Sequence, residues 1–193
     1  MRTITVFNSV SLDGVMQAPG RPDEDERGGF QHGGWAGKYA DPVMASFAGQ
    51  GLAREGGLLF GRRTYEDFYS VWPNRGDNPF TEVLNRRQKY VASRTLAEPL
   101  PWQNSTLLKS DAVDAVARLK QESDEDLLIL GSGELIRSLM PHKLIDRFIL
   151  LIHPLVLGSG RRLFADDGHL QALKLVDSKP TSTGVLITTY QPV

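Results

Sequence analysis

The segment LLFGRRTYEDF, residues 58–68, joins a short apolar run to a helical pattern through a glycine and two arginines. The run itself is typical of a buried strand, and a helix is expected from Thr64, with Asp67 in capping-box spacing. The start of a helix has unpaired N–H groups and the positive end of the helix dipole, so it favours an anion. Arg62 and Arg63 add positive charge there. The segment therefore predicts a phosphate site, with a solvated turn as the alternative.

A second strand-to-helix turn lies in LLILGSGELIRSLM, residues 127–140. The small side chains of Gly131, Ser132 and Gly133 would let a diphosphate approach the backbone closely. A G-x-G-x-x-G fingerprint would need a third glycine where this chain has Ile136, and no Walker loop is present. Tight turns also need glycine for conformation alone, and that is the alternative here.

A third candidate is the end of the expected strand 88–93, where Arg94 follows Ser93. An arginine in this place can bind a ribose 2′-phosphate. In an open α/β sheet, ligands bind outside the carboxyl ends of the strands. The three turns could therefore hold the two halves of one dinucleotide.

Extended and helical patterns alternate along the rest of the chain. Further helices are expected at 41–55, 111–121 and 134–140, a glycine-rich loop at 28–37, and further strands at 3–10, 104–108, 126–130, 145–157 and 184–191. No helix is expected between the last two strands. This order predicts one α/β domain over residues 1–193, with a mainly parallel sheet and an antiparallel edge near the C-terminus.

Composition excludes several classes of protein. The chain has no cysteine, so disulfides and thiolate metal sites are impossible, and its four histidines show no metal-ligand spacing. The chain has 22 basic and 23 acidic residues, so it lacks the excess of positive charge that binding to nucleic acid needs. No signal peptide and no apolar run long enough to span a bilayer are seen. We therefore expect a cytoplasmic protein that binds no metal, nucleic acid or membrane.

Five motifs occur in an order and spacing that resemble a known superfamily: NSVSLDGVM, LLFGRRTYEDF, VASRT, ILGSGELIRSLM and LIDRFILLIHPLVLGSGRRLF. From residue 2 to about 190 the chain resembles the dihydrofolate reductase-like superfamily, in the type of the riboflavin-biosynthesis reductase (RibD C-terminal domain). The segment 144–164 is the most specific part of this resemblance. The resemblance implies a three-layer α/β fold with a mixed, mostly parallel sheet of about eight strands flanked by helices.

The resemblance also implies an NADPH-dependent reductase and assigns residues to the cofactor. Gly61, Arg62, Arg63 and Thr64 would hold phosphates, and Ser93 and Arg94 would lie beside the 2′-phosphate. The diphosphate and the nicotinamide would contact Leu130, Gly131, Ser132, Gly133, Glu134 and Leu135. The loop that closes over the nicotinamide would contain Leu12, Gly14 and Val15.

The substrate is less defined than the cofactor. Candidate proton donors are Asp13, Glu134 and Asp41, and Trp35 and Tyr39 either form a wall of the substrate pocket or anchor the glycine-rich loop. Leu130 stands where the riboflavin reductases have a glutamate. In dihydrofolate reductases an acidic residue early in the first helix holds the pterin, and here only Asp41 is near the equivalent place. His153 and the pair Arg161 and Arg162 are expected in the core and in a solvated turn, respectively.

The substrate is expected to be a small heterocyclic or carbonyl compound, such as one like 5-amino-6-(5-phosphoribosylamino)uracil. Two alternatives stay open, a dihydrofolate reductase proper and a nucleotide-binding relative that has lost catalysis. The late strands are rich in apolar and β-branched residues, and an exposed edge of this kind invites pairing. A homodimer is expected, as the resemblance also implies.

Overall fold

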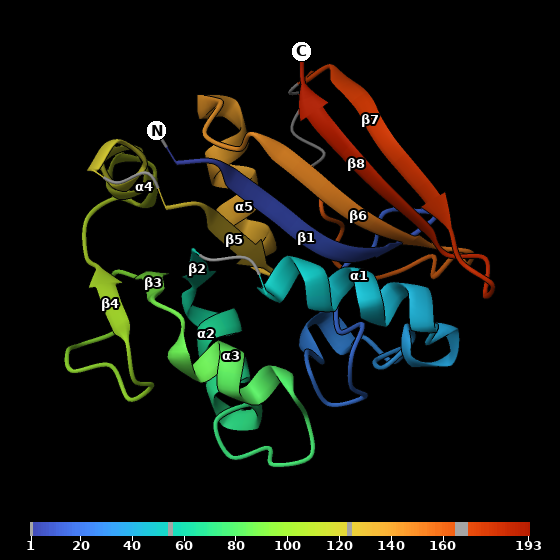
Figure 1. Cartoon of the computed structure of the whole chain (residues 1–193), viewed down its shortest axis with the longest axis horizontal. Helices are drawn as coiled ribbons and strands as arrows, with labels where there is room; N and C mark the ends of the chain where they lie inside the picture. Colours follow the sequence, from blue (N-terminus) through green and yellow to red (C-terminus); the bar gives the residue numbers. More distant parts are fainter. Residues whose placement is uncertain (1, 54–55, 123–124, 165–169) are drawn as a thin grey trace.

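The computed structural model describes residues 2–53, 56–122, 125–164 and 170–193, and its centre is one eight-stranded sheet (Figure 1). The strands are β1 (Ile4–Ser11), β2 (Gly57–Gly61), β3 (Lys89–Ala92), β4 (Ser105–Leu108), β5 (Leu127–Leu130), β6 (Arg147–His153), β7 (Leu173–Pro180) and β8 (Leu186–Pro192). The helices are α1 (Pro42–Ala53), α2 (Arg62–Val71), α3 (Phe80–Arg86), α4 (Ala112–Glu122) and α5 (Gly133–Leu139), with 3-10 turns at Arg27–Gly29, Gly37–Tyr39 and Met140–His142.

The strand order is β4-β3-β2-β5-β1-β6-β8-β7. Every neighbouring pair from β4 to β6 is parallel, and β8 runs antiparallel to both β6 and β7. The expected mostly parallel sheet with an antiparallel edge near the C-terminus is confirmed. Because the strands of a parallel sheet all point the same way, the turns after β1, β2, β3 and β5 meet at one edge.

The sheet is covered on both faces, and β2 shows why. Leu59 packs with α4 and α5 in one cluster, whereas Leu58 and Phe60 pack with α2, α3 and Trp102 in another. Side chains of a strand alternate between faces, so a strand buried on both sides has to be continuously apolar. This accounts for the run that precedes Gly61.

Three local expectations differ from the structure. The helix expected from Thr64 begins at Arg62, because Gly61 has extended dihedral angles and is the N-cap, so the predicted capping box is wrong. Strand β7 was missed, since most of its residues are exposed and lack an alternating pattern. The short helix α3 was missed as well. Among the described residues, no helix has the length and apolar character needed to cross a membrane.

Candidate active site

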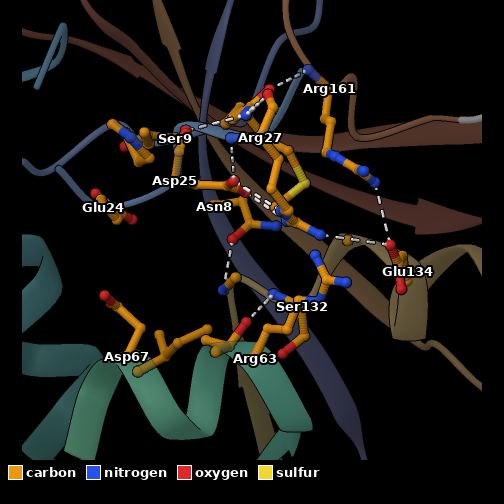
Figure 2. Close-up of a pocket in the computed structure, with 18 of the residues that line it drawn as sticks. Asn8, Ser9, Glu24, Asp25, Arg27, Arg63, Asp67, Ser132, Glu134 and Arg161 are labelled. Atoms are coloured by element: carbon orange, nitrogen blue, oxygen red, sulfur yellow. Dashed lines mark hydrogen bonds and ion pairs between the residues drawn. The ribbon is translucent and has the colours of Figure 1, made fainter. Parts of the chain in front are cut away.

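A cavity of about 540 Å³ opens at the carboxyl ends of the parallel strands, and we call it the central cavity (Figure 2). Side chains reach it from β1, from α2, from the turn between β5 and α5, and from two loops. Its lining consists of Phe7, Asn8, Ser9, Met16, Gln17, Ala18, Pro19, Glu24, Asp25, Glu26, Arg27, Arg63, Thr64, Asp67, Phe68, Leu130, Gly131, Ser132, Gly133, Glu134, Arg137 and Arg161.

A second depression of about 480 Å³ adjoins the first, and we call it the side groove. It is lined by Arg27, 61–64, 92–95, 110–112, 132–135 and Ser138. The central cavity and the side groove share Arg27, Arg63, Thr64, Ser132, Gly133 and Glu134. One elongated ligand could therefore occupy both, as expected for a dinucleotide at this edge of the sheet.

The side groove brings together most of the residues assigned to the cofactor from the sequence. These are Gly61, Arg62, Arg63, Thr64, Ser93, Arg94, Ser132, Gly133, Glu134 and Leu135. Leu130 and Gly131, which were assigned to the same group, line the central cavity. The assignment by sequence thus selected residues that are far apart in the chain and adjacent in space.

Hydrogen bonds join the two strand-to-helix turns. The N–H of Ser132 donates to Thr64 Oγ1 at 3.0 Å, and the N–H of Gly131 donates to Asn8 Oδ1 at 2.8 Å. Gly131 has φ +67°, and a Cβ atom at that position would lie 3.1 Å from the methyl group of Thr64. Glycine is therefore needed here both for its backbone conformation and for the close approach of α2.

Two of the arginines in the side groove are available for an anion. Arg63 and Arg94 are exposed, and in the described part of the chain neither has an ion-pair partner. Arg62 is engaged, since it donates to Thr95 Oγ1 at 2.9 Å and pairs with Glu66 at 3.7 Å. No side chain caps the start of α2, so its first N–H groups also face this region.

The loop that was expected to close over the cofactor contributes later residues to the cavity than the sequence indicated. Leu12, Gly14 and Val15 line neither the central cavity nor the side groove. Val15 is fully buried in a cluster with Phe30 and Trp35, which holds this part of the loop away from the cavity. Met16–Pro19 line the cavity instead, so the prediction for Leu12, Gly14 and Val15 has to be corrected to the residues that follow them.

Asp13 and Asp41 lie outside both spaces, in contrast to Glu134. Asp13 accepts hydrogen bonds from Ser11 Oγ at 2.6 Å and from the N–H groups of Leu157 and Gly158 at 3.1 and 2.9 Å. The Ser11 hydrogen bond is the main reason that the pKa of Asp13 is lowered to about 2. A carboxylate with this pKa and this position is poorly suited to donate a proton, so the geometry favours a structural role.

Asp41 is the N-cap of α1. Its Oδ1 accepts the N–H of Val43 at 2.7 Å, and its Oδ2 accepts hydrogen bonds from Ser182. The hydroxyl of Ser182 is the main cause of the lowered pKa of Asp41. The helix start expected from the Asp-Pro pair is confirmed, and the alternative role of Asp41 as a proton donor is not supported by its position.

Trp35 and Tyr39 anchor the glycine-rich loop, and neither lines the cavity. The indole N–H of Trp35 donates to the carbonyl of Gln17 at 2.8 Å. Both rings contact the imidazole of His153 edge-on, at 5.1 and 5.4 Å between centroids. His153 is fully buried, which lowers its pKa to about 4, so the expectation of a core histidine is confirmed.

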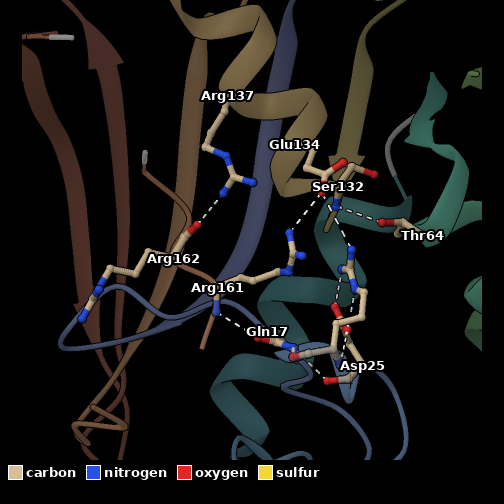
Figure 3. A network of polar contacts seen from close by, with 9 residues as sticks. Gln17, Asp25, Thr64, Ser132, Glu134, Arg137, Arg161 and Arg162 are labelled. Atoms are coloured by element: carbon tan, nitrogen blue, oxygen red, sulfur yellow. Dashed lines mark hydrogen bonds and ion pairs between the residues drawn. The ribbon is translucent and has the colours of Figure 1, made fainter. Parts of the chain in front are cut away.

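A network of polar residues at the cavity was not found from the sequence (Figure 3). Gln17 donates to the carbonyls of Asp25 and Arg27, and its Oε1 accepts the N–H of Arg161 at 2.9 Å. The guanidinium of Arg161 in turn pairs with Glu134 at 3.1 Å. Arg161 is exposed in a turn, as expected, and it also lines the cavity and links two loops to α5, which the sequence did not indicate.

Comparison with known proteins gives consistent results. The RibD C-terminal domain family matches residues 2–187. The uncharacterized protein YyaP of Bacillus subtilis is 32% identical over 139 residues, which cover 69% of this chain and 72% of YyaP. A crystal structure from Shewanella sp. PV-4, of a protein assigned to riboflavin biosynthesis, is 25% identical, with a TM-score of 0.75 and 99% of each chain covered.

The fold is also that of dihydrofolate reductases. The enzyme from Enterococcus faecalis, solved in complex with NADP(H), is 14% identical to this chain, with a TM-score of 0.63 and with 98% of this chain and 96% of that chain covered. At this identity the likeness concerns the fold alone.

Proposed function

Because the chain belongs to the RibD C-terminal domain family, we propose that it is an NADPH-dependent reductase that transfers a hydride to a small heterocyclic or carbonyl substrate. The observation that carries the proposal is the side groove, where Arg63 and Arg94 are exposed beside two joined strand-to-helix turns. This groove opens into a cavity with room for a substrate. The E. faecalis enzyme of the same fold was solved with NADP(H), which supports the choice of cofactor.

The residues present fit the phosphates of such a cofactor. The 2′-phosphate would lie with Arg63, Arg94 and Ser93, and the diphosphate with the start of α2. An arginine meets a phosphate with parallel, charge-assisted hydrogen bonds, which a ribose hydroxyl does not accept in the same way. The glycines of the second turn leave space for the backbone to approach the ligand.

When bound, NADPH supplies the hydride, and the protein positions the reactants and excludes water. Met16–Pro19 line one side of the central cavity, and Arg161 connects them to Glu134, because its N–H donates to Gln17 and its guanidinium pairs with Glu134. Of the three acids predicted as proton donors, Glu134 lines the cavity. Glu134 therefore remains the proposed donor among the three.

The test compares the binding of NADPH and NADH to the wild-type protein, Arg63→Ala, Arg94→Ala and the control Arg86→Ala. Arg86 is exposed on α3, outside the central cavity and the side groove. Hydrogen bonds to charged groups contribute about 1.5–3 kcal/mol each, so each site variant should lose roughly tenfold to hundredfold in NADPH affinity. NADH affinity should hardly change, and the control should match the wild type.

Two results would overturn parts of the proposal. Equal losses for NADPH and NADH would remove the 2′-phosphate assignment, and failure of the wild-type protein to bind NADPH would remove the function itself.

Oxidation of NADPH is then measured against pterins, uracil precursors and aldehydes. Turnover of dihydrofolate would identify a dihydrofolate reductase, and cofactor binding without any turnover a catalytically silent relative.

A further inference from the structure

The junction between the central cavity and the side groove carries an excess of positive charge. Among the residues that line both spaces, Arg27 and Arg63 are basic and Glu134 is acidic. Arg161 lines the central cavity close by, since its guanidinium pairs with Glu134. Arg63 has no ion-pair partner in the part of the chain that the structure describes. A ligand that extends from one space into the other therefore passes several guanidinium groups.

One carboxylate oxygen lies between two of these arginines. Glu134 Oε1 is 3.1 Å from Arg161 Nη1 and 3.8 Å from Arg27 Nη1, and Figure 2 shows both arginine side chains directed toward Glu134. The longer distance exceeds that of a hydrogen bond. Arg27 Nη1 is buried, and it has no hydrogen-bond partner among the described residues. Because a buried donor without an acceptor is costly, this nitrogen favours an added acceptor.

Other contacts hold both arginines in place. Arg27 donates to Asp25 through Nε and Nη2, so the planar fork directs its third nitrogen, Nη1, away from that carboxylate. The buried Gln17 bonds to the backbone of both arginines (Figure 3): its Nε2 donates to the carbonyl of Arg27 at 2.9 Å, and its Oε1 accepts the N–H of Arg161 at 2.9 Å. The two arginines are therefore a preorganised pair.

The Glu134 carboxylate is an exchangeable partner for this pair. Its side chain is 67% exposed, and ion pairs between exposed side chains contribute little to stability. Its Oε1 also reaches only one of the two guanidinium groups within hydrogen-bond distance. A phosphoryl group brings several acceptor oxygens together with its own negative charge, so it can bind both arginines at once.

We infer that Arg27 and Arg161 form a phosphoryl site, and that the Glu134 carboxylate is the internal anion that a phosphoryl group displaces. Two ligands can supply this group. One is the cofactor, whose diphosphate would cross the junction between the two spaces, and the other is a phosphate ester on the substrate. The first source rests on the proposed function, whereas the site itself does not.

Inorganic pyrophosphate is the probe for the site. Calorimetry measures its affinity at one fixed, low salt concentration, because salt screens the interaction. We expect Arg27→Ala and Arg161→Ala to bind pyrophosphate roughly tenfold more weakly than the wild type. The control Arg86→Ala removes the same charge from α3, outside both spaces, and should bind as the wild type does.

Glu134→Gln should have the opposite effect. It removes the competing charge and keeps the size of the side chain, so pyrophosphate should bind roughly tenfold more tightly. This gain should shrink when Glu134→Gln is combined with Arg27→Ala, because the two residues then act on the same ligand. A misfolded variant would not bind more tightly, so the gain tests the inference even if Arg27→Ala fails to fold.

Cofactor binding separates the two sources. NADPH and NADH share the diphosphate, so Arg27→Ala should weaken both equally if the cofactor supplies the group, whereas Arg63→Ala and Arg94→Ala should weaken NADPH alone. Saturation with NADP⁺ should then prevent pyrophosphate from binding. If the substrate supplies the group, Arg27→Ala keeps the wild-type affinity for both cofactors, and the NADP⁺-saturated protein still binds pyrophosphate more tightly after Glu134→Gln.

Three results would overturn the inference. These are no binding of pyrophosphate to Glu134→Gln, equal pyrophosphate affinity of Glu134→Gln and the wild type, and losses in Arg27→Ala and Arg161→Ala no larger than in Arg86→Ala. Failure of the wild-type protein to bind either cofactor would instead remove the proposed function. The pyrophosphate measurements would still decide whether the phosphoryl site exists.

Discussion

The hydroxyl of Ser132 accepts the N–H of Gly61 at 2.9 Å, across 71 residues of sequence. Gly61 ends β2 and caps α2, whereas Ser132 lies in the turn between β5 and α5 with φ +59°. The contact makes one rigid unit of two turns that the sequence shows as separate. A ligand that binds one of these turns therefore depends on the position of the other.

Thr64 tests this connection. Thr64→Val keeps the shape of the side chain but leaves the N–H of Ser132, a buried residue, without its acceptor, which costs about 1–3 kcal/mol. We expect a lower free energy of unfolding by about that amount in urea titrations, with weaker NADPH binding. Thr64→Ser is the control, since it keeps the hydroxyl. A loss in Thr64→Ser without a loss in Thr64→Val would assign the role to the methyl group that contacts Gly131 instead.

Asp13 is expected to act through the loop that carries Arg161. Its carboxylate holds the N–H groups of Leu157 and Gly158, so Asp13→Ala should release this loop and misplace the Arg161–Glu134 pair. We predict that turnover falls more than NADPH affinity, because Asp13 lies outside the side groove. Steady-state kinetics and cofactor titration of the same preparation measure both quantities. Equal losses would indicate a general folding defect.

The stability of the protein should depend on pH through His153. Its pKa is lowered from 6.5 to about 4 by burial, so in this range the unfolded chain binds a proton that the folded chain does not. The contribution of the uncharged His153 to the free energy of unfolding is fully present above pH 6.5 and is lost as the pH falls toward 4. The loss from this group between pH 7 and pH 5 should be about 2 kcal/mol.

His153→Met is the matching variant, because methionine adapts to irregular buried space. Urea unfolding at the two pH values should show a smaller pH-dependent loss in this variant than in the wild type. The same loss in both proteins would assign the acid sensitivity to other groups. His153→Met is also expected to leave NADPH binding intact, since His153 lines neither the central cavity nor the side groove.

A homodimer remains a prediction, and β7 is the surface on which to test it. This strand is the outer edge of the sheet, and its Leu175 and Val176 side chains are 50% and 51% exposed. An apolar edge with unpaired backbone groups favours pairing with a second copy. Light scattering at micromolar concentration should give a dimer, and Val176→Lys should shift it toward monomer. A monomeric wild-type protein would contradict the prediction.

Much of the site was predictable because its residues follow regular elements. Arg63, Arg94 and Ser132 each stand just after a strand with a clear apolar pattern, and parallel strands bring their carboxyl ends to one edge. Periodicity therefore located the side groove without knowledge of any contact. It also located the core, because strands such as β2 that are buried on both faces leave an unmistakable apolar run.

The loops that line the central cavity were not predictable in the same way. Glu24, Asp25 and Gln17 lie in an irregular loop. The sequence of such a loop has no periodic pattern that would show which way each side chain points. Their surroundings come from partners distant in sequence, as with Gln17 and Arg161, which are 144 residues apart. The pattern of residues thus set the fold and the sheet edge at which the three turns meet, because these follow from local periodicity. The packing of the loops set the roles of Asp13, Trp35 and Gln17, because hydrogen bonds between distant segments orient those side chains.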